Sequence, residues 1–303
     1  MRRGALFLIV LAGAALLSLA SSRILRSQTQ ATTVGDEACA QCHKLENGAY
    51  LASPHGRASR EGGDGPHCET CHGPGSLHVA AAGDTTDPGY ATVRNPARLT
   101  TQASSQICAS CHKGGETFYW QHGNHARAGV GCLNCHSVHH KQNADGGPML
   151  TASDANTLCL RCHTGKRASL AHSGHMPLRE GAMTCADCHN PHGSAADHQL
   201  RAATVNDLCT SCHADKRGPF LWEHPPVREN CLNCHQPHGS NNEQVLAAKR
   251  PYLCQRCHIG TRHPSTLYDN PDLVSNRMFN RSCQNCHSQI HGSNHPSGKY
   301  FER

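Results

Sequence analysis

Two neighbouring stretches determine how this chain folds: Cys209-Thr-Ser-Cys212-His213 and Cys231-Leu-Asn-Cys234-His235-Gln-Pro-His238. Their first cysteines are 22 residues apart. Both stretches contain the pattern Cys-x-x-Cys-His, which occurs ten times in 303 residues. The ten copies use all 20 cysteines, so no thiol remains for another role. The copies, each given as two cysteines and a histidine, are Cys39, Cys42 and His43; Cys68, Cys71 and His72; Cys108, Cys111 and His112; Cys132, Cys135 and His136; Cys159, Cys162 and His163; Cys185, Cys188 and His189; Cys209, Cys212 and His213; Cys231, Cys234 and His235; Cys254, Cys257 and His258; and Cys283, Cys286 and His287.

The spacing within each copy is that of covalent haem attachment. Residues at i, i+3 and i+4 lie on one face of a helical turn, so two thiols can bond the vinyl groups of a haem while the adjacent imidazole reaches its iron. Zinc ribbons and disulfide scaffolds also use paired cysteines, but neither requires a histidine after every second cysteine. A thioredoxin-like redox pair needs one motif beside a strand-helix pattern, which this sequence lacks. The motifs therefore predict ten covalently bound haem c groups.

The motifs fall into five tandem pairs, whose first cysteines are 29, 24, 26, 22 and 29 residues apart. We call each pair with its surrounding chain a module, and the predicted modules are 39–107, 108–158, 159–208, 209–253 and 254–303. Together they are predicted to form a single domain over 39–303. A chain built from repeated modules is expected to be quasi-linear.

Each module also repeats a histidine pattern outside its motifs. One histidine lies between the two motifs and another closely follows the second motif, as with His175 and His192 or His224 and His238. One extra histidine per haem predicts that every iron has two imidazole ligands. The predicted second ligands are His55, His78, His125, His139, His175, His192, His224, His238, His263 and His291. Methionine cannot serve throughout, because the chain beyond residue 20 holds only Met149, Met176, Met183 and Met278.

Some of these choices stay open at the level of sequence. Six histidines belong to neither set, namely His67, His122, His140, His172, His198 and His295. His122 lies three residues from His125, and His172 lies three residues from His175, so either member of each pair could be the ligand. The pattern also leaves open which second ligand serves which haem.

Composition indicates what forms the core. Aromatic residues make up 4% and hydrophobic residues 37% of the chain, and mean hydropathy is negative. Such a chain cannot offset its ordering entropy with protein side chains alone, so the haems are predicted to form the core. We expect short helices, as over 154–163 and 206–213 where a capping-type residue leads into a motif, and loops over 73–107, 141–158 and 264–282. The predicted fold class is a multihaem cytochrome c: mostly irregular, with short α-helices, little or no β-sheet, and an elongated file of ten haems.

The N-terminus has the features of an export signal. Two arginines precede an apolar run over 5–20 that ends in small residues. We predict a signal peptide over 1–20, a lead segment over 21–38, and export to the periplasm. The alternative is an uncleaved anchor, which the shortness of the run and the positions of Arg23 and Arg26 disfavour.

Charge argues against nucleic acid as a partner. The chain alone carries a formal charge of +6. Ten haems add about 20 propionates, which reverse that sign when they are ionised. The sequence also lacks a basic run with interleaved aromatic residues, which nucleic-acid binding would need.

The ligand count points to electron transfer. An iron with two protein ligands has no open position for a substrate, so its chemistry is one-electron transfer and no enzyme activity is expected. Ten such irons in repeated modules predict a relay that spans a distance. The alternatives are a soluble periplasmic electron shuttle, a multihaem reductase with one open haem, and a cytochrome filament for which His295 is the spare ligand. No motif histidine is missing or replaced by lysine, which argues against the reductase.

Three stretches resemble the MtrA, PioA and DmsE family of decahaem cytochromes: His72-Gly-Pro, the segment from Cys212 to Ser240, and the segment from His287 to Lys299. The resemblance extends over the chain from Asp36 onward. It implies that the ten extra histidines occupy the second-ligand positions. It also implies a staggered, nearly linear file of haems inserted into an outer-membrane β-barrel porin.

The same resemblance implies partners and a location. The chain would exchange electrons with periplasmic electron-transfer cytochromes at one end and with a surface multihaem cytochrome or mineral at the other. It would lie in the periplasm, associated with the outer membrane through the barrel, and serve metal reduction or iron oxidation. The direction of electron flow is not fixed by the sequence.

Overall fold

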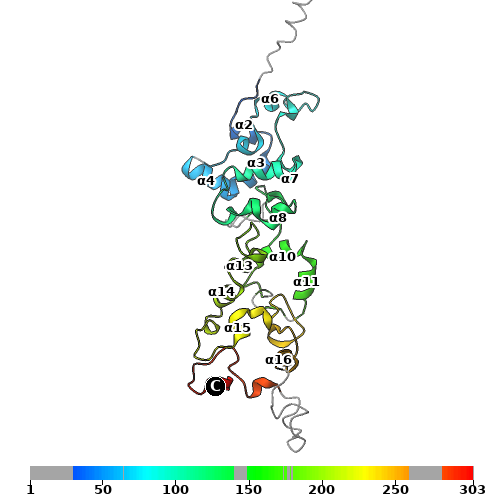
Figure 1. Cartoon of the computed structure of the whole chain (residues 1–303). Helices are drawn as coiled ribbons and strands as arrows, with labels where there is room; N and C mark the ends of the chain where they lie inside the picture. The colour runs from blue at the N-terminus through cyan, green and yellow to red at the C-terminus, as the bar shows by residue number, and fades with distance from the viewer. Residues whose placement is uncertain are drawn as a thin grey trace, which may run out of the picture. The chain divides into compact units, whose positions relative to one another are not determined.

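The computed structural model describes residues 30–63, 65–139, 149–172, 174–175, 178, 180–258 and 282–302. The predicted signal peptide and the predicted ligand His263 lie outside the described residues. The described chain consists of short helices joined by irregular segments (Figure 1). It divides into two compact units, one made of residues up to Leu51 with His55–Arg98, and the other of Ala52–Pro54 with Leu99 onward.

The elements up to Arg98 are helical, and none exceeds nine residues. They are α2 (Asp36–Ala40), α3 (Lys44–Ala52), α4 (Pro54–Gly62), α5 (Cys68–His72), α6 (Ser76–Ala80), η1 (Tyr90–Thr92) and η2 (Pro96–Arg98), where η denotes a 3-10 helix. Two of them, α2 and α5, contact each other and contain cysteines of the first module.

The same kind of element recurs from Leu99 onward. The helices are α7 (Thr101–Ala109), η3 (Gly115–Thr117), η4 (Trp120–His122), α8 (Asn124–Arg127), α9 (Cys132–Cys135), α10 (Ala155–Leu160), α11 (Thr164–Leu170), α13 (Cys185–Cys188), η6 (Asp197–Gln199), α14 (Val205–Thr210), η7 (Ala214–Lys216), α15 (Pro225–Glu229), η8 (Cys231–Asn233), η9 (Glu243–Val245), α16 (Tyr252–Gln255), η11 (Cys283–Asn285) and η12 (Gly298–Tyr300). Within the described segments, no helix combines the length and the apolar character that a membrane crossing would require.

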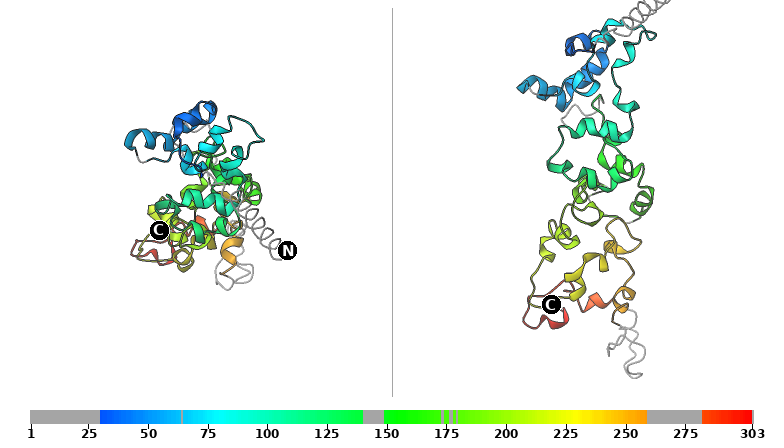
Figure 2. Two further views of the ribbon diagram at one scale, coloured as in Figure 1. Left: turned by 90° about the horizontal axis from the view of Figure 1, so that it is seen from above. Right: turned by 45° about the horizontal axis from the view of Figure 1, so that its top comes forward.

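Extended strands are missing from the described residues, from whichever side the chain is viewed (Figure 2). Isolated bridges take their place, and three of them join a second-motif histidine to a leucine further along the chain. These bridges are His136 with Leu150, His189 with Leu200, and His235 with Leu246. Short helices, irregular segments and paired haem motifs confirm the predicted fold class of a multihaem cytochrome c.

The haem motifs occupy two recurrent positions. Several first motifs lie toward the C-terminal end of a capped helix, as in α7, α10 and α14, whose N-caps are Thr100, Asp154 and Thr204. Second motifs form one-turn helices of their own, such as α9, α13 and η8. Because α7 contacts α9, α10 contacts α13 and α14 contacts η8, the two motifs of a module lie side by side.

Two predictions of local structure are wrong in part. The helix expected over 206–213 is capped by Thr204 rather than by Asn206, because Thr204 Oγ1 accepts the Asp207 N–H at 3.0 Å. Residues 73–107 are not a plain loop, because α6, η1, η2 and most of α7 lie there. The helix predicted over 154–163 is present as α10 with Asp154 as its N-cap, so the predicted loop over 141–158 extends too far. Gly and Pro in these segments separate short helices instead of excluding them.

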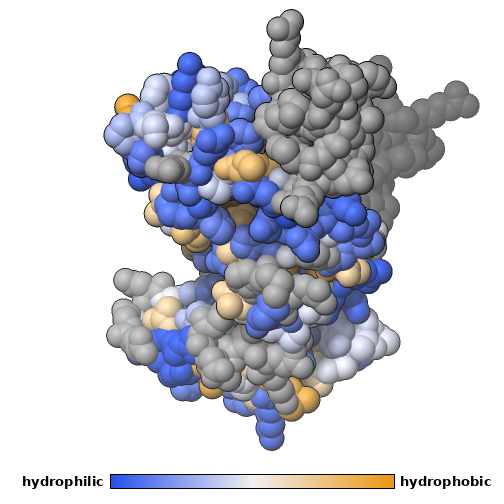
Figure 3. All heavy atoms as spheres, turned by 90° about the horizontal axis from the view of Figure 1, so that it is seen from below, coloured by the Kyte–Doolittle hydropathy of each residue, from blue (hydrophilic) through white to orange (hydrophobic). Residues whose placement is uncertain are grey.

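Protein side chains form very little core. Among the described residues, the buried apolar side chains are Ala49, Tyr50, Ala81, Ala152, Leu170 and Leu246, and no large side chain is completely enclosed. Hydrophilic residues dominate the face in Figure 3, with hydrophobic residues in small groups. A chain of this size ordinarily buries a continuous apolar core, so the interior requires groups other than side chains.

Candidate haem-binding sites

Seven motif histidines face a second histidine ring. In each pair the two ring centroids are between 5.9 and 6.2 Å apart. The pairs are His43 with His78, His163 with His125, His136 with His192, His213 with His175, His189 with His238, His258 with His224, and His235 with His291. All seven partners belong to the ten histidines predicted as second ligands.

This spacing fits an iron held between two imidazoles. A metal–nitrogen bond of about 2.0 Å on each side, with roughly 1.1 Å from nitrogen to ring centre, separates two ligand rings by about 6 Å. Aromatic rings in general pair anywhere between about 4.5 and 7 Å. A common value in seven pairs that differ in sequence context therefore favours one recurring occupant, and the adjacent Cys-x-x-Cys identifies that occupant as haem c.

In the second unit, the paired histidines come from neighbouring modules. A first-motif histidine faces a histidine of the preceding module, as His163 faces His125. A second-motif histidine faces a histidine of the following module, as His189 faces His238. The six pairs of this unit follow this alternation, whereas His43 and His78 belong to the same module. Adjacent modules thus exchange histidines.

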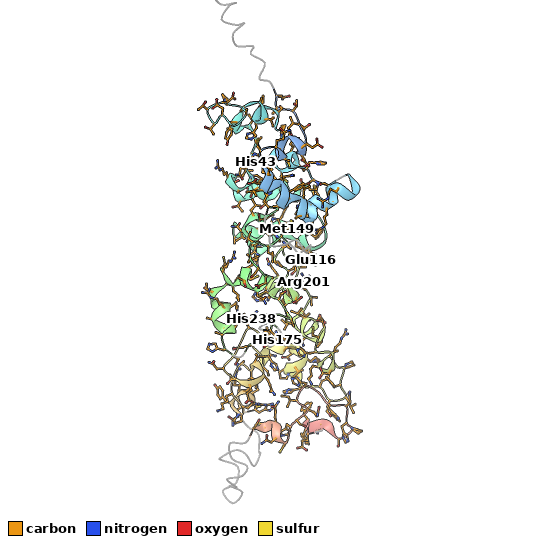
Figure 4. All side chains as sticks on the ribbon, turned by 180° about the vertical axis from the view of Figure 1, so that it is seen from behind. His43, Glu116, Met149, His175, Arg201 and His238 are labelled. Atoms are coloured by element: carbon orange, nitrogen blue, oxygen red, sulfur yellow. The ribbon has the colours of Figure 1, made fainter. Side chains whose placement is uncertain are left out.

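Further contacts join the modules where the histidines are exchanged. Between the second and third modules, His125 Nδ1 lies 2.8 Å from the carbonyl oxygen of Pro191, the residue before His192. Figure 4 labels Glu116 and Arg201, whose side chains form an ion pair at 2.9 Å across the same boundary. Because His125 is bonded to the residue before His192, the two exchanged histidines are positioned together.

A glycine follows three of the exchanged histidines, and each has a positive φ. The values are 110° at Gly193, 126° at Gly239 and 140° at Gly292. A Cβ at Gly193 would lie 2.7 Å from the Tyr119 carbonyl oxygen, and a Cβ at Gly239 would overlap the backbone carbonyl of Ser169. The repeated His-Gly-Ser sequence therefore allows the neighbouring module to approach closely, for which only glycine has room.

Second-motif histidines are oriented by backbone carbonyls. The Nδ1 atoms of His189 and His235 lie 2.9 and 3.0 Å from the carbonyl oxygens of His198 and Gln244, and that of His287 lies 2.6 Å from the Tyr300 carbonyl. An imidazole that donates its Nδ1 proton in this way presents an unprotonated Nε2 to a metal. His198 thus contributes through its carbonyl, a role that its side chain did not reveal in the sequence.

Burial favours the neutral form of the second-ligand histidines. It lowers the pKa of His175, His192, His224, His238 and His291, and in each case a nearby cation or imidazole lowers that pKa further. Neutral imidazole is the form that binds a metal. Among the described residues, His175, His192 and His224 also have a buried Nδ1 without a hydrogen-bond partner.

The cysteines of neighbouring motifs are adjacent in a regular order. Within every module, the sulfur atoms of the two first cysteines are close enough to share a hydrogen bond. The hydrogen bond from Cys108 lowers the pKa of the Cys132 thiol to about 6. Between modules, second cysteines interact instead, as Cys188 does with Cys212. From Cys108 to Cys283, successive attachment points therefore interact alternately through first and second cysteines.

The second cysteines of the motifs differ from the first in exposure. All ten first cysteines are partly buried. The second cysteine is exposed in the first motif of every module and in the last motif of the chain. In the remaining four motifs the second cysteine is partly buried, namely Cys71, Cys135, Cys188 and Cys234. The exposed residues are Cys42, Cys111, Cys162, Cys212, Cys257 and Cys286. Side-chain packing therefore leaves these six thiols accessible, as thioether formation with a vinyl group requires.

The remaining predicted ligands are less fully described. His72, His112 and His287 are motif histidines, His55 and His139 are predicted second ligands, and all five make contacts in the structure. In the two ambiguous places, the rings that face motif histidines belong to His125 and His175 rather than to His122 and His172. Asn156 and Asn206 were not predicted as site residues, although their side chains join the two motifs of a module. Their recurrence three residues before a first cysteine was the available signal.

The paired haem motifs and the sequence of this chain match those of known proteins. The family model for a doubled CXXCH motif matches residues 125–168, 175–218 and 224–263. The chain is 37% identical to the multiheme cytochrome MtrA of Shewanella baltica (strain OS185) over 279 residues, which cover 89% of this chain and 81% of that protein. A solved structure, the undecaheme cytochrome from the S-layer of Carboxydothermus ferrireducens, is 22% identical with a TM-score of 0.16. That match covers 79% of this chain and about a third, 33%, of the other.

Proposed function

This chain belongs to the MtrA family of multihaem c-type cytochromes, and from that premise we propose that it conducts electrons across the outer membrane through ten bis-histidine haems. The observation that supports the proposal most directly is the set of seven motif histidines facing a second imidazole. A bound haem with two such ligands supplies reversible one-electron transfer. Histidine on both faces excludes a substrate from the iron, so we propose a carrier without enzyme activity.

The residues proposed to hold the ten haems are those predicted from the sequence. The 20 motif cysteines form the thioethers and the ten motif histidines supply one axial ligand each. The seven paired histidines supply seven second ligands, and we assign His55, His139 and His263 as a set to the three remaining irons. The ring positions favour His125 over His122 and His175 over His172.

The alternating sulfur contacts support a continuous route. First cysteines adjoin within modules, and second cysteines interact across the three module boundaries between Cys135 and Cys257, which supports adjoining attachment sites within the second unit. The cysteines of adjoining sites would hold bound haems close to one another, and haems held in this way would supply one-electron transfer between neighbouring centres.

The membrane setting of this route is proposed from the family resemblance. We place the chain in the periplasm, within an outer-membrane β-barrel porin that insulates it from lipid. Periplasmic electron-transfer cytochromes would exchange electrons at the inner end, and a surface multihaem cytochrome or an extracellular mineral at the outer end.

A liposome assay tests the conduit. The chain should copurify with a barrel protein, and liposomes containing both should pass electrons from external dithionite to a cytochrome c trapped inside. Liposomes without either protein are the control and should leave the trapped cytochrome oxidised. A sealed complex that fails to reduce the trapped cytochrome would reject the conduit and leave a soluble electron shuttle as the function.

The exchange of histidines between modules predicts which haem changes when a second-ligand histidine is removed. His238→Ala should convert one haem to the high-spin state, and that haem should be the one attached by Cys185 and Cys188, because His238 faces His189. Electron paramagnetic resonance of the oxidised protein measures this as one new high-spin signal while the thioether-bound haem count stays unchanged.

Two backgrounds identify the affected haem. In protein carrying both Cys185→Ser and Cys188→Ser, which lacks the sixth haem, His238→Ala should add no high-spin signal. In protein carrying both Cys231→Ser and Cys234→Ser, which lacks the haem of the motif next to His238, the signal should still appear. The reverse result would show that His238 serves its own module and would contradict the exchange.

A further inference from the structure

The residue three positions before a first motif makes the same contact in four modules. Its side-chain oxygen accepts the backbone N–H of the first cysteine in the second motif of that module. Asp36 accepts from Cys68 at 2.8 Å, Ser105 from Cys132 at 3.4 Å, Asn156 from Cys185 at 2.8 Å, and Asn206 from Cys231 at 2.8 Å. Three different residue types thus provide one acceptor at one position, which points to the acceptor as the common requirement.

The two asparagines bind on both sides of the second motif. Asn206 Nδ2 donates to the carbonyls of Val227 and Arg228 at 2.9 and 3.0 Å, and its Oδ1 accepts from Cys231. Asn156 Nδ2 donates in the same way to the Met183 carbonyl at 3.1 Å. The amide therefore fixes both the approach of the chain to the second motif and the first residue of that motif.

Helix geometry links this contact to the sulfur atoms. Asn206 and Cys209 are three residues apart in α14, so their side chains lie on one face of the helix. When Asn206 binds the backbone of Cys231, the Cys209 and Cys231 sulfurs are brought together, and they are close enough to interact. The polar contact and the sulfur contact are thus two parts of one arrangement.

Helix capping does not explain these residues. The N-caps of α10 and α14 are Asp154 and Thr204, so Asn156 and Asn206 lie inside their helices. Asparagine is unfavourable inside a helix, because its side chain competes for backbone hydrogen bonds. Its presence at this position in two modules therefore requires a gain elsewhere, which the bonds to the second motif provide.

We infer that Asp36, Ser105, Asn156 and Asn206 are positioning residues that set the separation between the two haem attachment points of a module. The inference rests on the proposed relay, since the separation between neighbouring haems governs the electron step within a module. In the fifth module Pro251 occupies the equivalent position and has no side-chain acceptor. There the Arg250 side chain bonds to Gln284, the residue after Cys283, so a different contact joins the last two motifs.

The test compares three variants of the full-length, haem-loaded protein. Asn206→Ala removes the acceptor and the two donated bonds, Asn206→Asp keeps the acceptor but loses the donated bonds, and Asn95→Ala is the control. Asn95 also accepts one backbone N–H, from Ala97 at 3.0 Å, and lies outside the haem motifs. All variants should retain ten haems by mass and an all-low-spin spectrum, because no cysteine or axial ligand is changed.

Two readouts depend on haem separation rather than on stability. The Soret-region circular dichroism, which reports coupling between neighbouring haems, should change in Asn206→Ala, change less in Asn206→Asp, and stay as in the parent in Asn95→Ala. The current through a protein monolayer between two electrodes should fall in Asn206→Ala and fall less in Asn206→Asp.

Several outcomes would overturn the inference. Asn206→Ala that matches the parent in both readouts shows that the acceptor does not set the separation. Asn206→Ala that loses a haem or gains a high-spin signal assigns Asn206 to attachment or ligation instead. Asn206→Asp that behaves as Asn206→Ala assigns the positioning to the bonds that Nδ2 donates rather than to the acceptor. The dichroism requires no electron transfer, so it decides the positioning role even for a parent protein that fails to relay electrons.

Discussion

Chain produced without haem attachment should be largely unfolded. The expected result is a far-ultraviolet circular dichroism spectrum without the helical signal of the holoprotein, and no cooperative thermal transition. The reason is the small core: six apolar side chains are buried among the described residues, and three of them are alanines. Ordering one residue of backbone costs about 1–2 kcal/mol, whereas burying a leucine stabilises by about 1.5–3 kcal/mol, so this core cannot order the chain alone.

The helices cannot supply the missing stability themselves. In the described segments none exceeds nine residues, and isolated helices of that length are marginal in water. Their caps, such as Thr100 on α7, contribute only about 1 kcal/mol each. The free energy of folding therefore depends on haem burial and axial ligation.

A variant that lacks a single haem serves as the control, because it separates the effect of losing all haems from the effect of substituting cysteines. Cys283→Ser together with Cys286→Ser should remove one haem near the C-terminus and leave most of the helical signal, whereas haem-free parent protein should lose it. Native-like ellipticity and a cooperative transition in the haem-free parent would show that side chains suffice to fold the chain, which would contradict a core made of haem.

Haem attachment, which depends on residues close together in sequence, could be predicted in full. Cys-x-x-Cys-His is a covalent requirement satisfied within one turn, so attachment and fold class follow from spacing alone. A count of one extra histidine per iron predicted the second ligands, and seven of those ten histidines face a motif histidine, but the ligand set stays a prediction. Their pairing was not accessible, since His125 and His163 are brought together by contacts between modules and no local pattern encodes those.

The misassigned helix start has a related cause. Asn206 has the side chain of an N-cap residue and precedes a motif, so it was expected to begin a helix. Thr204 takes that role, and Asn206 bonds to Cys231, 25 residues away. The same side-chain chemistry that favours a cap also serves a tertiary contact, and sequence alone does not distinguish the two. The module boundaries stay a prediction.

Gly239→Ala should destabilise the holoprotein strongly and disturb a haem outside its own module. Gly239 has φ 126°, and an added Cβ would overlap the carbonyl of Ser169 in the preceding module. The position of a Cβ is fixed by its own backbone and the Ser169 carbonyl is itself backbone, so the clash cannot be relieved by a side-chain rotation. We expect a loss of about 3 kcal/mol or more in the free energy of unfolding, from backbone strain and the displaced contact together.

The displacement should also reach the iron. His238 precedes Gly239 and faces His189, so a shift of this turn moves one imidazole away from the haem attached by Cys185 and Cys188. Denaturant unfolding should give a lower midpoint, and electron paramagnetic resonance a partial high-spin signal. Gly165→Ala is the matched control, because nothing lies within 4 Å of a Cβ there and alanine favours helix α11. If Gly239→Ala unfolded at the same midpoint as Gly165→Ala with every haem low-spin, the close approach of the modules at His-Gly-Ser would not hold the exchanged histidine in place.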